Sequence, residues 1–92
     1  MMAGMVARPV TAVDVATIRY FKHVAEEQER GVSWLSRKAG IPYPTLKTYW
    51  DTESRALTMG DIDQLMRVLH VDPGKAVKEI RRLATAIQQA DS

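Results

Sequence analysis

The chain has 92 residues, a formal net charge of +2 and no cysteine. A chain of this length forms one small domain, and the lack of cysteine excludes a disulfide framework, a thiolate nucleophile and cysteine-based zinc sites. Because the sequence has neither a signal-peptide pattern nor an apolar run of about 18 residues, the length of a membrane-spanning helix, we expect a cytoplasmic protein that does not enter a membrane.

The first residues differ in pattern from the rest of the chain. Residues 1–10 show no helical or strand-like periodicity, and we predict that they form a flexible N-terminal arm, which carries Arg8. Residues 11–90 contain apolar residues at helical spacing. We therefore predict that they form a single folded domain.

A capping-box pattern marks the start of the first predicted helix. Thr11 is followed three residues later by Asp14, whose carboxylate can accept the backbone N–H of the capping residue. We expect this helix to end at Gly31, since glycine commonly terminates helices. Its inward face is predicted from the apolar spacing to consist of Val13, Ile18, Phe21, Val24 and Ala25.

Two short helices are predicted next, separated by Gly40. Ser33 is the N-cap candidate of the first, WLSRKA, which is too short to be stable without packing against neighbours. In the following run, IPYPTLKTYW, apolar residues stand three and four positions apart, which favours a helix over a strand. Pro42 and Pro44 fit this helix if it begins near Pro42 or Tyr43, because the N–H that proline lacks is unpaired in a first turn.

Two further helices are predicted after the polar segment DTESRAL, which we interpret as a loop. Thr58 and Asp61 repeat the capping-box pattern, and Asp72 followed by Pro73 is an N-cap with proline at the first helical position. Five short helices without strand-like alternation predict an all-α fold, a compact five-helix bundle. The expected inward residues are Ile62, Leu65, Met66 and Leu69, followed by Val77, Ile80, Leu83, Ala84 and Ile87.

Charge is distributed unevenly along the chain. The segment from Arg30 to Trp50 contains basic residues and no Asp or Glu, whereas Glu26, Glu27 and Glu29 lie just before it. A local basic face on a nearly neutral chain suits a polyanion such as DNA. The same charges are also compatible with an ordinary solvated helix surface.

The two short helices around Gly40 have the pattern of a helix-turn-helix. Leu35 and Ala39 are expected to face inward from the first helix, and Leu46 and Tyr49 from the second. Glycine suits the turn because a left-handed backbone conformation is costly for other residues.

The segment from Val32 to Val77 resembles the lambda-repressor-like helix-turn-helix family, which includes phage repressors, Cro proteins and Xre-type regulators. LSRKAGI, TLKTYW and LHVDP carry the resemblance. It implies a bundle of five helices whose third helix enters the major groove of DNA. Four positions depart from the family pattern. Val32 stands where a polar residue often opens the second helix, and Ser36 replaces the usual Ala. Pro42 replaces the usual Ser or Thr cap, and Pro44 a polar base-reading residue.

The resemblance directs the first turn of the third helix at the bases. Apolar surface can contact a thymine methyl group, Lys can donate to guanine, and Thr can serve either role. Alternatively, Tyr43 packs on Trp34 or Trp50, and Lys47 is an ordinary solvated side chain. The expected base-contacting residues are Tyr43, Pro44, Lys47 and Thr48.

Phosphate contacts are expected around the same helix. The N-terminus of the second predicted helix offers free N–H groups and a favourable dipole end for an anion. In the arm, Arg8 is a candidate for entering a minor groove. The expected phosphate-contacting residues are Ser33, Trp34, Arg37, Lys38, Thr45 and Arg55.

These features predict a sequence-specific regulator of transcription that binds double-stranded DNA. We expect a phage-type immunity repressor or a Cro-like repressor acting by operator occupancy, because 92 residues leave no room for a second sensor domain. The alternatives are an antitoxin, an excision-type accessory factor, or a protein-interaction module that uses Tyr43, Tyr49 and Trp50 as an apolar patch.

The last predicted helix offers a possible homodimer surface. Its apolar residues fall at the spacing of a coiled-coil seam, but two heptads are too few to identify one, and the same face can cover the protein's own core. The residues concerned are Val77, Ile80, Leu83, Ala84 and Ile87.

We expect no enzyme activity, metal, cofactor or small-molecule substrate. His23 and His70 fall on different predicted helices, and Glu26 and Glu27 lie at the spacing of ordinary helix neighbours of His23. No third metal ligand is evident there. The sequence also has no glycine-rich phosphate loop and no nucleophile motif.

Overall fold

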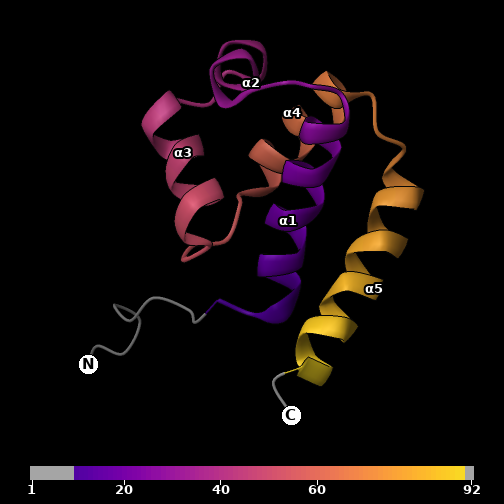
Figure 1. Cartoon of the computed structure of the whole chain (residues 1–92). Helices are drawn as coiled ribbons and strands as arrows, with labels where there is room; N and C mark the ends of the chain where they lie inside the picture. Colours follow the sequence, from indigo (N-terminus) through magenta and orange to yellow (C-terminus); the bar gives the residue numbers. More distant parts are fainter. Residues whose placement is uncertain (1–9, 91–92) are drawn as a thin grey trace.

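The computed structural model describes residues 10–90, and this part of the chain folds into five α-helices without a strand (Figure 1). The all-α five-helix bundle predicted from the sequence is confirmed. The helices are α1 (Ala12–Glu27), α2 (Val32–Ala39), α3 (Tyr43–Thr52), α4 (Met59–Leu69) and α5 (Pro73–Ala90).

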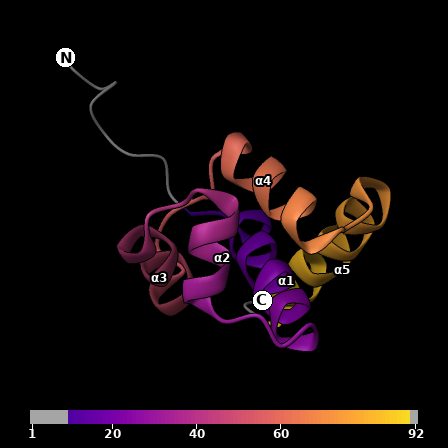
Figure 2. The ribbon, with the colours of Figure 1, turned by 90° about the horizontal axis from the view of Figure 1, so that it is seen from above.

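The helix α1 lies in the middle of the bundle. It packs most extensively against α5 and also contacts α3 and α4, while α2 packs on α3 and α4. Both views show α3 and α5 on opposite sides of α1 (Figures 1 and 2). The largest fully buried side chains, which define the core, are Ile18, Phe21, Leu35, Leu46, Tyr49, Leu65 and Leu69.

The starts of three helices follow the capping patterns of the sequence. The Thr11 hydroxyl accepts from the Asp14 N–H, and the Asp14 carboxylate accepts from the Thr11 N–H at 2.9 Å, which completes the predicted capping box. The N–H of Asp61 donates to the Thr58 hydroxyl at 3.0 Å. At α5, the Asp72 carboxylate accepts from the backbone N–H three residues later.

The predicted end of α1 at Gly31 is wrong. The helix ends at Glu27, and Glu29 takes the left-handed conformation with φ 57°. The N–H of Arg30 donates to the Ala25 carbonyl at 2.8 Å, the long bond of a Schellman motif. Because Glu29 makes this turn, Gly31 remains extended and becomes the N-cap of α2.

The segment DTESRAL is a loop only in part. The helix α3 continues through its first two residues and ends at Thr52, whose hydroxyl donates to the Thr48 carbonyl. Glu53 then adopts the left-handed conformation, with φ 52°. Threonine can continue a helix when its hydroxyl bonds to the preceding turn, so polarity alone does not mark the helix end here.

Two predicted core residues are exposed. Val13 at the start of α1 and Val77 at the start of α5 face an open groove between α1, α4 and α5. In this turn of α5 the buried residue is Ala76, and Val77, which was expected to be buried, is exposed. The first turns of these helices border the groove without covering it, so helical periodicity at these two positions does not lead to burial.

Candidate nucleic-acid interface

The turn between α2 and α3 has the geometry of a helix-turn-helix. Gly40 caps α2 in the left-handed conformation, with φ 71°. A Cβ atom placed there would meet nothing within 4 Å, so a side chain would not be excluded by a steric clash. Glycine is needed because it adopts the left-handed conformation without strain. The Ser36 hydroxyl donates to the Ile41 carbonyl at 2.6 Å and thereby ties α2 to the residue after the turn.

The helix α3 begins at Tyr43, as predicted. Pro42 is its N-cap and Pro44 lies in its first turn, where neither proline removes an intrahelical hydrogen bond. The Leu46 N–H donates to the Pro42 carbonyl at 3.0 Å and starts the helix. Tyr43 is 45% exposed and Pro44 is exposed, so a stiff, apolar first turn faces solvent.

The outer face of α3 carries the four residues expected to contact bases. Tyr43, Pro44 and Lys47 are exposed, and Thr48 is partly exposed. The Thr48 hydroxyl donates to the Pro44 carbonyl at 2.8 Å, so its oxygen is left as an acceptor. The four residues recur at helical spacing on the side opposite the buried face of α3.

Lys47 does not stand alone on this face. Its ammonium group lies 2.6 Å from the carboxylate of Asp51, one turn further along α3. This hydrogen bond raises the pKa of Lys47 above its usual value. Asp51 was not among the predicted site residues, although the spacing of four positions is the signal of such a pair.

Two side chains of α1 hold the far end of α3. Arg19 donates two hydrogen bonds to Glu53, and the Lys22 ammonium donates to the Trp50 carbonyl at 3.4 Å. The Arg19 guanidinium lowers the pKa of the Glu53 carboxylate. This ion pair was not predicted, since its two residues lie 34 positions apart in the sequence.

The helix α2 presents its own polar face beside α3. Ser33, Arg37 and Lys38 are exposed and Trp34 is half-buried, with the Arg30 guanidinium 4.2 Å from its ring centre. The prediction that Ser33 caps α2 is wrong, because Gly31 holds that position and has no side chain to accept a hydrogen bond. The first-turn N–H groups of α2 therefore lack a side-chain cap.

The remaining residues predicted to contact DNA or a partner protein lie in different surroundings. Thr45 is partly exposed, and the guanidinium of Arg55 lies 5.4 Å from the centre of the Tyr49 ring. Arg8 lies outside the described residues. The apolar patch of Tyr43, Tyr49 and Trp50 is not formed, because Tyr49 and Trp50 are buried in the core and only Tyr43 is exposed.

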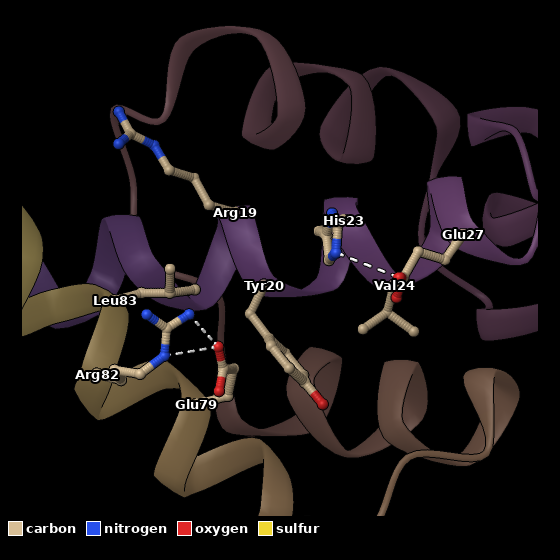
Figure 3. Close-up of a pocket in the computed structure, with 8 residues that line it drawn as sticks. All are labelled: Arg19, Tyr20, His23, Val24, Glu27, Glu79, Arg82 and Leu83. Carbon is tan, nitrogen blue, oxygen red and sulfur yellow. Dashed lines mark hydrogen bonds and ion pairs between the residues drawn. The ribbon is translucent and has the colours of Figure 1, made fainter.

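A separate cleft of about 560 Å³ lies between α1 and α5 (Figure 3). Four of its ionisable residues are paired within their own helices, His23 with Glu27 on α1 and Arg82 with Glu79 on α5, whereas Arg19 is paired with Glu53. The close-up shows Arg19 pointing away from these pairs. In the range 10–90, no group of three or more His, Cys, Asp or Glu residues is arranged to hold a metal ion.

Hydropathy gives one further result. None of the helices in the described range combines the length and the apolar character needed to cross a bilayer.

The fold and the α2–α3 unit define a helix-turn-helix protein. A family model described as the Cro/C1-type HTH DNA-binding domain matches residues 23–78, more than half of the chain. The chain belongs to this family of DNA-binding domains, and the resemblance seen in the sequence is confirmed. No curated protein and no solved structure matches the chain.

Proposed function

We propose that this protein is a transcriptional repressor that acts by occupying a DNA operator, in the manner of a phage immunity repressor or a Cro-like protein. The single observation that carries this proposal is the exposed face at the start of α3. Tyr43 and Pro44 lie in the first turn of α3, and Lys47 and Thr48 follow one turn later on the same face. Neither α2 nor the part of α3 before Lys47 contains an acidic residue. An exposed helix face of this kind fits the major groove of B-DNA.

Each residue of that face has a distinct proposed role. Tyr43 and Pro44 supply apolar surface for thymine methyl groups. The Thr48 oxygen accepts from a base amino group, because its proton is already donated to the Pro44 carbonyl. Lys47 donates to guanine, which requires it to leave Asp51. Binding at Lys47 thus replaces the carboxylate of Asp51 with the neutral hydrogen-bond acceptors of a base.

The proposed phosphate contacts surround this face. The uncapped first turn of α2 offers backbone N–H groups and a positive dipole end to a phosphate oxygen. Exposed cations on both sides of α3 add affinity that depends on salt and not on sequence. These contacts are assigned to Ser33, Trp34, Arg37, Lys38, Thr45 and Arg55.

The ends of the chain have secondary roles in this proposal. We assign DNA binding to residues 11–90 and treat residues 1–10 as an arm from which Arg8 reaches a minor groove. Of the apolar residues of α5, Ala84 is buried in the core, whereas Leu83 and Ile87 are partly exposed. A homodimer would use these last two, and its operator half-sites would then lie about 34–36 Å apart.

Selection of bound sequences from a random duplex pool tests the function. We expect enrichment of a defined sequence at low salt, and a steep loss of affinity from about 50 to 200 mM salt. Arg37→Ala should weaken binding to all duplexes, whereas the matched control Lys78→Ala, an exposed cation on α5, should not. Recovery of a pool with no enriched sequence would refute the proposal.

A further inference from the structure

An apolar groove with a volume of about 410 Å³ lies between α1, α4 and α5. Its walls come from Val13 on α1, Met59 and Met66 on α4, and Val77 and Ile80 on α5. No residue of α2 or α3 lines it. The groove is therefore a surface distinct from the face proposed to read DNA.

Most of the large hydrophobic residues that are exposed in the described part of the chain line this groove. The large hydrophobic residues that are exposed in the range 10–90 are Val13 at 49%, Tyr43 at 45%, Met59 at 80% and Val77 at 52%. Every one of them except Tyr43 lines the groove. Exposed apolar residues that cluster around a concave surface are typical of a site for a partner. Methionine suits such a site, since its flexible thioether adapts to different surfaces.

The groove has a positively charged edge. Arg81 lines it directly, and Lys78 and Lys75 continue around the solvent face of α5. None of these three cations forms an ion pair with a described residue. The only acidic residue of α5 is Glu79, which is paired with Arg82 on the side of the other cleft.

The acidic residues near the groove are already engaged. Asp63 holds Arg67 at 2.9 Å on α4, and Asp72 accepts from the Lys75 N–H at 2.9 Å. Asp14 accepts from the Thr11 N–H at the start of α1. Among the residues that line the groove, Arg81 alone carries a charge, so the charge at the groove wall is positive and the complementary partner is acidic.

We propose that the groove binds an amphipathic helix of another protein, with large apolar side chains on one face and acidic residues along its flank. Apolar anchors at helical spacing fill grooves of this kind, and flanking charges set the orientation and the rate of association. A symmetric pairing of two copies through this face is disfavoured, since it would bring Lys78 and Arg81 of one copy close to the same cations of the other.

Binding of a synthetic peptide tests the proposal. The probe is a fluorescent peptide of about 18 residues, long enough to form a helix, with Leu and Phe at helical spacing on one face and Glu on the other. Fluorescence anisotropy with the full chain should show saturable binding. A peptide of the same composition with the apolar spacing scrambled, and one with Lys in place of Glu, should each bind at least about tenfold more weakly.

Variants on the groove and off it locate the site. The double variant Met59→Ser and Val77→Ser alters exposed side chains, so it leaves the core intact, and it should weaken peptide binding at least about tenfold. Arg81→Glu should weaken the Glu peptide and strengthen the Lys peptide. The matched control Tyr43→Ala changes the one large hydrophobic residue of the range 10–90 that is exposed away from the groove, and it should leave peptide binding unchanged.

Three results would overturn the proposal. The first is equal binding of the peptide to the wild-type chain and to the Met59→Ser and Val77→Ser variant. The second is displacement of the peptide by an unlabelled DNA duplex, which would mean a shared surface. The third is a dimer in sedimentation that the double serine variant abolishes, which would mean that a second copy fills the groove. Since no residue of α2 or α3 takes part, failure here leaves the proposed repressor function untouched.

Discussion

The guanidinium group of Arg19 on α1 donates to both carboxylate oxygens of Glu53, the C-cap residue of α3. The two donor–acceptor distances are 2.9 Å from Nε to Oε2 and 3.0 Å from Nη2 to Oε1. Two parallel bonds fix direction as well as distance. They hold the end of the proposed reading helix on the central helix of the bundle, so α3 has a defined orientation before it meets DNA.

Breaking this ion pair should destabilise the fold by a small amount. Both side chains are partly solvated, at 53% and 24% exposure, so we expect Glu53→Gln to cost about 0.5–1 kcal/mol, or roughly 2–6 °C in Tm. A double-mutant cycle with Arg19→Met, followed by thermal unfolding, isolates the coupling of the pair. Additive effects of the two substitutions would show that the pair contributes nothing.

The same pair should make stability depend on pH in the acidic range. Arg19 lowers the pKa of Glu53 below its usual 4.5, so the carboxylate stabilises the folded state above that value, and this contribution disappears as pH falls through the lowered pKa. The difference in Tm between the wild-type chain and Glu53→Gln should therefore shrink as the pH falls below about 4.5. Arg82 also lowers the pKa of Glu79, but Glu79 is present in both proteins, so its contribution cancels in the difference in Tm. A difference that persists unchanged at the lowest pH would contradict this assignment.

Removing the acidic partner of Lys47 should strengthen DNA binding. Asp51→Asn frees the ammonium group and deletes a negative charge from the face of α3, so we expect roughly three- to tenfold tighter binding at low salt and a steeper salt dependence. The matched control is Asp63→Asn, which breaks an ion pair of the same spacing on α4. Fluorescence anisotropy with one duplex measures both variants. Equal effects of the two substitutions would show that Asp51 has no special place at the interface.

The turn glycine should tolerate no side chain without strain. Gly40→Ala meets no atom within 4 Å, yet it places alanine at φ 71°, so we expect a loss of about 1–2 kcal/mol in denaturant unfolding. Gly31 has equally open surroundings but an extended backbone. Gly31→Ser should instead stabilise the chain by a few tenths of a kcal/mol, since it supplies the missing cap of α2. A stabilising Gly40→Ala would contradict the assigned conformation.

The parts of the fold that follow local rules could be predicted from the sequence. Thr11, Thr58 and Asp72 each cap a helix through a residue three positions away, and Gly40 makes its turn through its own backbone freedom. Each of these depends on a few neighbouring residues. Local chemistry alone is sufficient to find them.

The helix ends without glycine could not be predicted in this way. Glu29, Glu53 and His70 all adopt left-handed conformations that composition assigns to glycine or asparagine. Tertiary contacts lie at or next to all three turns: Arg19 binds Glu53, and the amide group of Gln28, next to Glu29, donates at 2.8 Å to the carbonyl of Leu69, next to His70. Such contacts join residues far apart in the chain.

The exposure of apolar residues was also beyond the reach of periodicity. Val13 and Val77 have the spacing of core residues, but what covers them is decided by how the first turns of three helices meet. In the same way, the segment from Arg30 to Trp50, which has no acidic residue, indicated a basic face, and Asp51 lies just past the end of that segment. Helical periodicity identifies the apolar face of a helix, but it does not identify which other residues lie beside or cover that face.

In the proposed complex, the first turn of α3 reads bases while α2 holds phosphates. The most direct measurement compares Tyr43→Ala and Arg37→Ala on a duplex recovered by selection and on its single-base variants. We expect Tyr43→Ala to lose discrimination at particular base pairs, and Arg37→Ala to weaken all duplexes about equally. Loss of affinity without any change in discrimination for Tyr43→Ala would contradict a base-reading role for the first turn of α3.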